Sequence, residues 1–322
     1  FDIGFNLNLF RNRLNFDISY YYKLTTDLLL ERPVPHTTGF TSVMDNIGKV
    51  ANQGLDFMVN TVNIDTKDFG WSSTLNFNYN KNEIKKLGEN DEDILTGPWF
   101  ISGNLVILRK GESLGSFWGY KREGIWGEDE AEEAKAAGAG VGQPKRSKDR
   151  EILGKGLPDV TGSFINNFRY KNFDLTVDLQ FVLGVDVYQQ FLHSTEDRFG
   201  IANALSSVLS EGWTPANTNT MIPALYSQNS QPDSHWVANG SYLRANLIQL
   251  GYTFEPSVLK ALHLGSLRAY FSVNNAFCIT SKDFKGYDPE GTSWNTDQWG
   301  QNIMFFQYPK PRTYTLGVNV SF

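Results

Sequence analysis

Runs of alternating apolar and polar residues recur along the chain, and one such run ends it. In this run Tyr314, Leu316, Val318, Val320 and Phe322 are apolar or aromatic, whereas the residues between them are small or polar. Successive side chains of a β-strand point to opposite faces, so the run predicts a strand with one apolar and one polar face. Its length suits a tilted strand that crosses a bilayer, which needs about 9–11 residues.

Eight earlier runs show the same alternation, so the pattern predicts nine strands. We expect them at residues 2–9, 14–22, 53–63, 71–80, 161–170, 173–185, 242–254, 266–278 and 313–322. The run at 161–170 is the weakest, because Asn166 interrupts its apolar side.

The predicted connections between these strands alternate between short and long. The long ones occupy residues 24–52, 81–159, 186–241 and 279–311. Outer-membrane barrels have this layout, with short periplasmic turns and longer extracellular loops. The pattern therefore predicts an all-β fold, an antiparallel transmembrane β-barrel, in which residues 1–322 form one domain with four long extracellular loops. Bacterial single-chain barrels have even strand counts, so nine strands indicate the C-terminal fragment of a larger barrel.

The two faces of such strands differ in what they would contact. The apolar face would contact outer-membrane lipid, and the polar face would line the lumen. The positions that we predict to face the lumen are Asn76, Asn78, Asp174, Asp178, Arg268 and Asn274.

Composition narrows the class of protein further. Aromatic residues make up 14% of the chain, and several lie near predicted strand ends, as in the interfacial girdles of membrane barrels. No run of about eighteen apolar residues occurs, which excludes a spanning helix. The net charge of -6 argues against nucleic acid as a partner.

Motifs for catalysis or metal binding are missing from the sequence. The four histidines, none with metal-ligand spacing to another His or Cys, are His36, His193, His235 and His263. No nucleophile elbow, P-loop or dinucleotide-binding glycine run occurs. The carboxylate pairs Glu196–Asp197 and Asp288–Glu290 are interpreted as solvated loop charges rather than glycosidase acids. We therefore predict no enzymatic activity, no catalytic or metal-binding residues and no cofactor.

The long connections are rich in aromatic residues beside Asn, Gln and Asp. Flat rings and polar groups together can capture a sugar or a peptide by stacking and hydrogen bonding. We predict ligand contacts at Trp118, Tyr120, Trp213, Trp236, Trp294 and Trp299. The alternative is that these rings pack the loops against one another or onto a partner. The stretch 128–137 is acidic at its start and is followed by glycine, which predicts a short surface helix.

Four short motifs lie in order along the chain. They are Asn46-Ile-Gly-Lys-Val-Ala-Asn-Gln-Gly54, Gly115-Ser-Phe-Trp-Gly-Tyr120, Ser241-Tyr-Leu-Arg-Ala-Asn-Leu-Ile-Gln-Leu-Gly-Tyr252 and Gly286-Tyr-Asp-Pro-Glu290. With the strand at 313–322, they resemble the C-terminal barrel of the SusC/RagA-like TonB-dependent transporters of Bacteroidetes. The chain departs from that family at 145–151, which reads Lys-Arg-Ser-Lys-Asp-Arg-Glu where many members carry an acidic D-x-N-x-D-G run.

The resemblance implies a function and a set of partners. It implies a plugged outer-membrane barrel of about 22 strands that imports glycan or peptide fragments. A SusD-like lipoprotein would cover the outer loops, with other surface lipoproteins as further candidates. TonB–ExbB–ExbD would supply energy through a region N-terminal to this chain, and the barrel-assembly machinery would read the last strand at Tyr314, Leu316, Val318, Val320 and Phe322. Two alternatives remain: a non-energised porin or structural barrel, and a soluble carbohydrate-binding β-protein.

Overall fold

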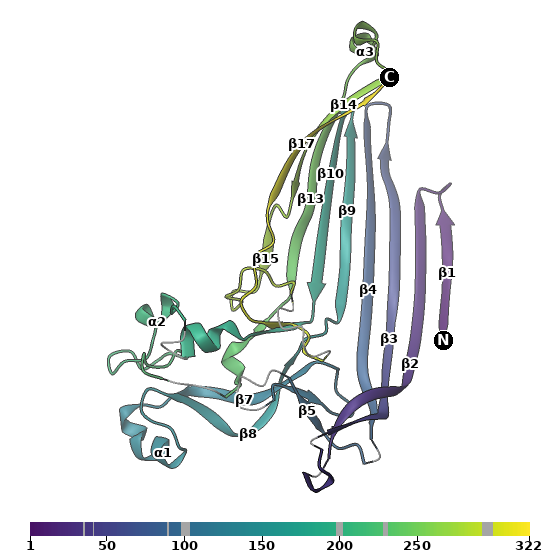
Figure 1. Ribbon diagram of the computed structural model, residues 1–322. Helices are drawn as coiled ribbons and strands as arrows, with labels where there is room; N and C mark the ends of the chain where they lie inside the picture. The colour runs from purple at the N-terminus through teal and green to yellow at the C-terminus, as the bar shows by residue number, and fades with distance from the viewer. Residues whose placement is uncertain are drawn as a thin grey trace.

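A computed structural model describes residues 1–34, 36–40, 42–88, 90–97, 104–197, 202–227, 231–291 and 299–322. Within them, nine long strands form one antiparallel sheet in which each strand pairs with the next one along the chain (Figure 1). They are β1 (Asp2–Leu9), β2 (Leu14–Pro33), β3 (Ser42–Asp65), β4 (Phe69–Leu87), β9 (Val160–Tyr170), β10 (Phe173–Leu183), β13 (Tyr242–Thr253), β14 (Ser266–Asn274) and β17 (Thr313–Ser321). All nine predicted strands are confirmed.

The register of the sheet aligns apolar residues from strand to strand. One row runs through Phe168, Leu175, Leu250, Phe271 and Leu316, which are direct partners on five successive strands. Leu250, Phe271 and Leu316 are exposed on this face. An apolar band this wide would be costly in water, and it is the surface that a lipid-facing sheet presents.

The weak strand at 161–170 has a structural explanation. Asn166 lies on the apolar face, where its side-chain oxygen accepts hydrogen bonds from the Ser73 hydroxyl at 2.8 Å and the Trp71 indole at 3.1 Å. Asn63 in turn donates to the Ser73 hydroxyl at 2.8 Å. The polar groups therefore satisfy one another, and the strand keeps its place in the sheet.

The prediction that residues 24–52 form a loop is wrong for most of that range. β2 continues to Pro33 and β3 begins at Ser42, with register shifts after Thr25 and Leu28. At about 3.3 Å per residue, the 24 residues of β3 span far more than a hydrocarbon core of about 30 Å. The far part of this hairpin has no lipid to face, so it needs no apolar alternation, and the sequence signal is lost there.

The other long connections fold into compact structure. One forms a four-stranded sheet of β5 (Ile94–Thr96), β6 (Val106–Leu108), β7 (Ser116–Ile125) and β8 (Pro144–Lys155). A three-stranded sheet combines β12 (Val237–Asn239), β11 (Asp186–Gln189) and β16 (Ile303–Met304), and β15 (Cys278–Thr280) adds to β13. Figure 1 shows β5, β7 and β8 gathered at one end of the large sheet.

Helical segments are short. They are η1 (His36–Thr38), η2 (Glu128–Glu130), α1 (Ala131–Ala136), η3 (His193–Asp197), α2 (Ser207–Ser210), η4 (Ser234–Trp236) and α3 (Pro256–Leu262). The helix predicted at 128–137 is confirmed by η2 and α1. None of the helices in the described ranges has the length and apolar character to cross a membrane.

The hydrophobic core lies in the folded loops rather than along the large sheet. Its largest cluster consists of Leu105, Val106, Phe117, Tyr188, Leu192, Trp236 and Ile303, all with no exposed surface. A second cluster joins Ile84 and Leu87 of β4 to Ile94 and Leu108 of the four-stranded sheet. The loops are therefore packed as a unit onto the end of the sheet.

Candidate functional site

The loop core contains two of the aromatic residues that we expected to contact a ligand. Trp236 is 0% exposed, and its ring lies edge-on to Tyr188 at 5.8 Å between centroids. Trp213 is 5% exposed and packs with Ile125 and Ala224. The prediction of ligand contacts is wrong for these two rings, because they stabilise the loops from inside.

The remaining aromatic candidates differ in their burial and in the side chains that contact them. Trp118 is half-buried, with the Arg109 guanidinium 4.7 Å above its ring, and Tyr120 has the Arg150 guanidinium at 5.1 Å. Trp299 is half-buried against the loop core. Trp118, Tyr120 and Trp299 therefore stay predictions, and Trp294 lies outside the described residues.

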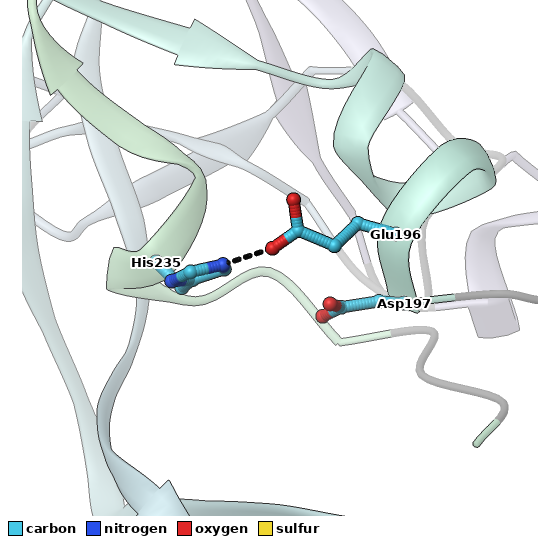
Figure 2. A group of neighbouring side chains, drawn as sticks. All are labelled: Glu196, Asp197 and His235. Atoms are coloured by element: carbon cyan, nitrogen blue, oxygen red, sulfur yellow. Dashed lines mark hydrogen bonds and ion pairs between the residues drawn. The ribbon is translucent and has the colours of Figure 1, made fainter. Parts of the chain in front are cut away.

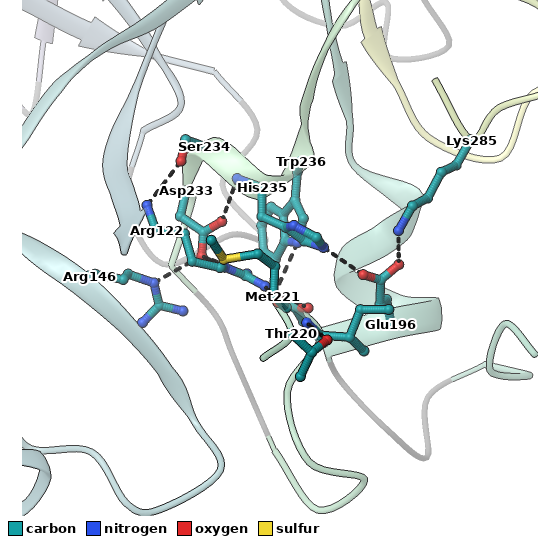
Figure 3. A network of polar contacts seen from close by, with 12 residues as sticks. Arg122, Arg146, Glu196, Thr220, Met221, Asp233, Ser234, His235, Trp236 and Lys285 are labelled. Carbon is teal, nitrogen blue, oxygen red and sulfur yellow. Dashed lines mark hydrogen bonds and ion pairs between the residues drawn. The ribbon is translucent and has the colours of Figure 1, made fainter. Parts of the chain in front are cut away.

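A buried ion network at Arg122 connects three separate loop segments (Figure 3). Arg122 of β7 donates to Asp233 at 2.7 and 3.0 Å and forms a short ion pair with Asp197 at the end of η3. Arg146 of β8 donates to the same Asp233 oxygen at 3.0 Å, and the indole of Trp236 donates to Asp197 at 3.1 Å. Burial would lower the pKa of Arg122, but the charges of Asp197 and Asp233 outweigh it and raise the pKa.

A second carboxylate next to this network is held by two basic side chains. Oε1 of Glu196 lies 2.5 Å from Nε2 of His235, and its Oε2 lies 2.8 Å from Nζ of Lys285. Burial would raise the pKa of Glu196, but the contacts with His235 and Lys285 lower it overall. Glu196 is therefore ionised at neutral pH, and since a carboxylate only accepts, Nε2 of His235 carries the proton.

Glu196, Asp197 and His235 lie close enough to be considered as metal ligands (Figure 2). Both oxygens of Glu196 already accept hydrogen bonds, and Asp197 accepts from Arg122 and Trp236. A divalent cation here would displace these donors and lie beside the guanidinium of Arg122. The geometry fits an ion network that fixes the loops better than it fits a metal site.

The sequence did not predict this network, and it misassigned two of its members. Glu196 and Asp197 were interpreted as solvated loop charges, yet they are 4% and 0% exposed. Asp288 is 5% exposed and forms a bidentate pair with Arg244, at 3.0 and 2.6 Å. This pair joins the Ser241–Tyr252 motif to the Gly286–Glu290 motif, so both motifs serve to fix one loop on β13.

The asparagine-rich motif at 46–54 ties the large sheet to the loops. Asn52 accepts a hydrogen bond from Asn82 at 2.8 Å, and Asn82 accepts from the backbone N–H of Leu114 at 2.8 Å. Leu114 directly precedes the Gly115–Tyr120 motif, which contributes Phe117 to the loop core. The two motifs are thus linked through a chain of amide groups.

The residues predicted to face the lumen share the polar face of the sheet. Asp174 of β10 and Arg268 of β14 form an ion pair at 2.5 and 3.1 Å that passes over β13. The strand between them carries Gly251 at this point, and a Cβ there would lie within 2.6 Å of both side chains. Asp178 and Asn274 occupy the same faces of β10 and β14 as these partners.

Two further polar-face residues make cross-strand hydrogen bonds. Asn76 donates to the Ser163 hydroxyl at 3.0 Å, and Asn78 donates to Asp56 through a short contact. On β17, Tyr314, Leu316, Val318 and Val320 alternate with smaller residues as predicted. Their role as an assembly signal stays a prediction.

Known proteins share this chain's sequence across nearly its whole length. Residues 1–276 match the family model described as TonB dependent receptor-like, beta-barrel. TonB-dependent receptor P3 of Formosa agariphila is 34% identical over 340 residues, which cover 100% of this chain and 34% of that protein. TonB-dependent receptor SusC of Bacteroides thetaiotaomicron is 30% identical over 329 residues, covering 99% of this chain and 31% of SusC. The chain spans about a third of the length of these curated relatives.

Solved structures share the fold. The RagAB peptide importer in its closed-closed state superimposes with a TM-score of 0.79 at 26% identity, covering 100% of this chain and 35% of the matched chain. The open-open state of the same importer gives a TM-score of 0.79 at 26% identity, with 100% and 34% coverage.

Proposed function

Because this chain belongs to the TonB-dependent receptor β-barrel family and is SusC/RagA-like, we propose that it forms part of an energised outer-membrane importer. Members of this family are outer-membrane transport proteins rather than enzymes. On this proposal, residues 1–322 form the C-terminal portion of one barrel, with the folded loops outside the cell and the short turns in the periplasm.

The observation that carries the proposal is the apolar row across the sheet. It places Leu250, Phe271 and Leu316 side by side on an exposed face. In lipid, unpaired backbone groups cost several kcal/mol each, so the free edges of β1 and β17 would pair with further barrel strands. The polar face, with its Asn, Asp and Arg side chains, would then line the lumen around a plug.

The transported ligand is proposed to be a glycan or peptide fragment, captured at the folded loops. Trp118 and Tyr120 offer partly exposed aromatic surface there, and loops on a rigid scaffold commonly carry binding sites. A SusD-like lipoprotein would cover these loops, TonB–ExbB–ExbD would supply energy through the plug region, and other surface lipoproteins could join the complex. The RagAB structures, which are of a peptide importer, support a two-component arrangement.

The decisive experiment measures uptake in cells that carry the full-length protein. Fluorescent oligosaccharides and peptides of graded size would be offered to cells with and without the transporter, in TonB-positive and TonB-negative backgrounds. Energised import predicts uptake that needs both the transporter and TonB. Uptake that needs the transporter but persists without TonB would instead indicate a passive porin and overturn the proposal.

A further inference from the structure

A pocket of about 450 Å³ lies where three loop segments meet, and we call it the loop pocket. One wall is the segment 210–222, and the other is formed by His235 of η4 and Lys285 from the connection between β15 and β16. The side chains that matter for recognition are Glu211, Asn217, Asn219, Thr220, His235 and Lys285. No Phe, Tyr or Trp is among the described residues that line it, so recognition there depends on charge and hydrogen bonding rather than stacking on a large ring.

The segment 210–222 is held in place by its own contacts. The side-chain amide of Asn217 donates to the carbonyl oxygen of Glu211 at 3.0 Å. The buried Arg122 donates to the carbonyl oxygen of Met221 at 2.8 Å. The wall is therefore formed before a ligand arrives, which reduces the ordering cost of binding.

The basic wall is equally fixed. The backbone N–H of Lys285 donates to the side chain of Gln189 at 2.6 Å, and that of His235 donates to Asp233 at 3.0 Å. Both basic side chains lie against Glu196, whose side chain is 0% exposed, whereas those of His235 and Lys285 are 15% and 35% exposed. A ligand entering the pocket therefore meets the two basic groups and not the carboxylate behind them.

Lys285 has donor capacity beyond Glu196. An ammonium group carries three N–H donors, and one donor of Lys285 points to Glu196. The Nε2–H of His235 also points to Glu196, so the Lys285 ammonium is the group of this wall that remains to pair with a negatively charged ligand. Among the described residues of the lining, Glu211 supplies the one carboxylate, and Asn217, Asn219 and Thr220 add amide and hydroxyl groups.

We propose that the loop pocket binds an anionic substituent, a carboxylate or a sulfate ester, of the ligand that the protein takes up, with the Lys285 ammonium as its partner. The proposal rests on the proposed transport function for the identity of the ligand as cargo. The binding itself depends only on the geometry of the pocket.

The test is isothermal titration calorimetry on the full-length protein in detergent. The probes are trigalacturonate, triglutamate and glucose 6-sulfate, with fully methyl-esterified trigalacturonate as the uncharged match. We expect at least one anionic probe to bind and the methyl ester to bind at least about tenfold more weakly, because one charged hydrogen bond is worth about that much. The comparison among probes distinguishes a sugar acid, a peptide carboxylate and a sulfate ester.

Three variants test whether the probes bind in the loop pocket. Lys285→Met should weaken binding about tenfold, Lys285→Arg should stay within a few-fold of the parent, and Glu211→Gln should strengthen binding by removing a repulsive charge. Hydrogen exchange of each variant shows whether the loops remain folded. Equal binding of acid and methyl ester, no loss in folded Lys285→Met, or weaker binding in Glu211→Gln would each overturn the proposal. The titration does not measure transport. Binding can therefore be found when TonB-dependent uptake is absent, and uptake can be found when binding in the pocket is absent.

Discussion

Replacing Arg122 by Met should loosen the folded loops, because it removes the cation shared by two buried carboxylates. The side chains of Asp197 and Asp233 are 0% exposed, and Arg122 donates to both. Removing one partner of a buried ion pair costs about 3–5 kcal/mol. Trp236 and Arg146 would still donate to the two carboxylates, so we expect the lower end, about 3 kcal/mol.

Hydrogen exchange measures this loss directly, because amides in β7, β8 and η4 exchange when the loops open locally. A loss of about 3 kcal/mol should speed their exchange more than about a hundredfold, since each 1.4 kcal/mol is a factor of ten. The matched control is Lys110→Met, which breaks an ion pair to Asp91 whose lysine side chain is 55% exposed. An exposed pair is worth about 0–1 kcal/mol, so the control should change exchange by less than about fivefold.

The reasoning would be refuted if Arg122→Met speeded exchange no more than Lys110→Met does. A second variant tests the stated cause. Adding Asp197→Asn to Arg122→Met removes one of the two stranded charges, so exchange in the double variant should slow again relative to Arg122→Met alone. No recovery would indicate lost packing of the arginine rather than uncompensated charge.

Three further predictions concern the sheet and the pH response of the loops. Gly251→Val should disrupt the ion pair that passes over β13 and lower the temperature at which the folded barrel unfolds on gels, whereas Gly140→Val, with nothing within 4 Å of its added Cβ, should not. Lysine at Leu316 should cost about 2–4 kcal/mol near the bilayer midplane and reduce the assembled fraction in membranes, whereas lysine at Thr315 on the polar face should be tolerated. The folded-state pKa of Glu196 is lowered from 4.5, so the stabilisation by its charge is present above that value and is lost as pH falls through the lowered pKa. Proteolysis of the loops should therefore rise on acidification. Glu196→Gln should remove the part of this pH dependence that is due to Glu196.

The nine strands could be predicted because the bilayer imposes a local rule. Each position contacts either lipid or the polar side of the sheet, so neighbouring residues alternate between apolar and polar. The face on which Leu316 lies can therefore be inferred from the sequence of its own strand. Strand segments that do not follow this alternation could not be predicted from the sequence. Residues 24–33 and 42–52 extend β2 and β3 past the length that a hydrocarbon core of about 30 Å requires, and their sequence shows no regular alternation.

The folded loops could not be predicted because burial there depends on partners far away in the sequence. Asp197 meets Arg122 across 75 positions, and Arg122 meets Asp233 across 111. Trp236 and Trp118 both lie in predicted loops, yet Trp236 enters the core beside Tyr188, whereas Trp118 is only half-buried.

The motifs that resemble the family contain residues of these long-range contacts, but the sequence alone does not show which motifs contact each other. The Ser241–Tyr252 and Gly286–Glu290 motifs are separate in the sequence, and the Arg244–Asp288 pair shows that they contact each other in the structure. The same holds for the 46–54 and 115–120 motifs, which Asn82 links through hydrogen bonds to Asn52 and Leu114. Each motif therefore fixes a loop to the end of a strand, and the Arg244–Asp288 pair holds the segment that carries Lys285 of the loop pocket. A variant that breaks this pair should weaken ligand binding in the titration without touching any residue that lines the pocket.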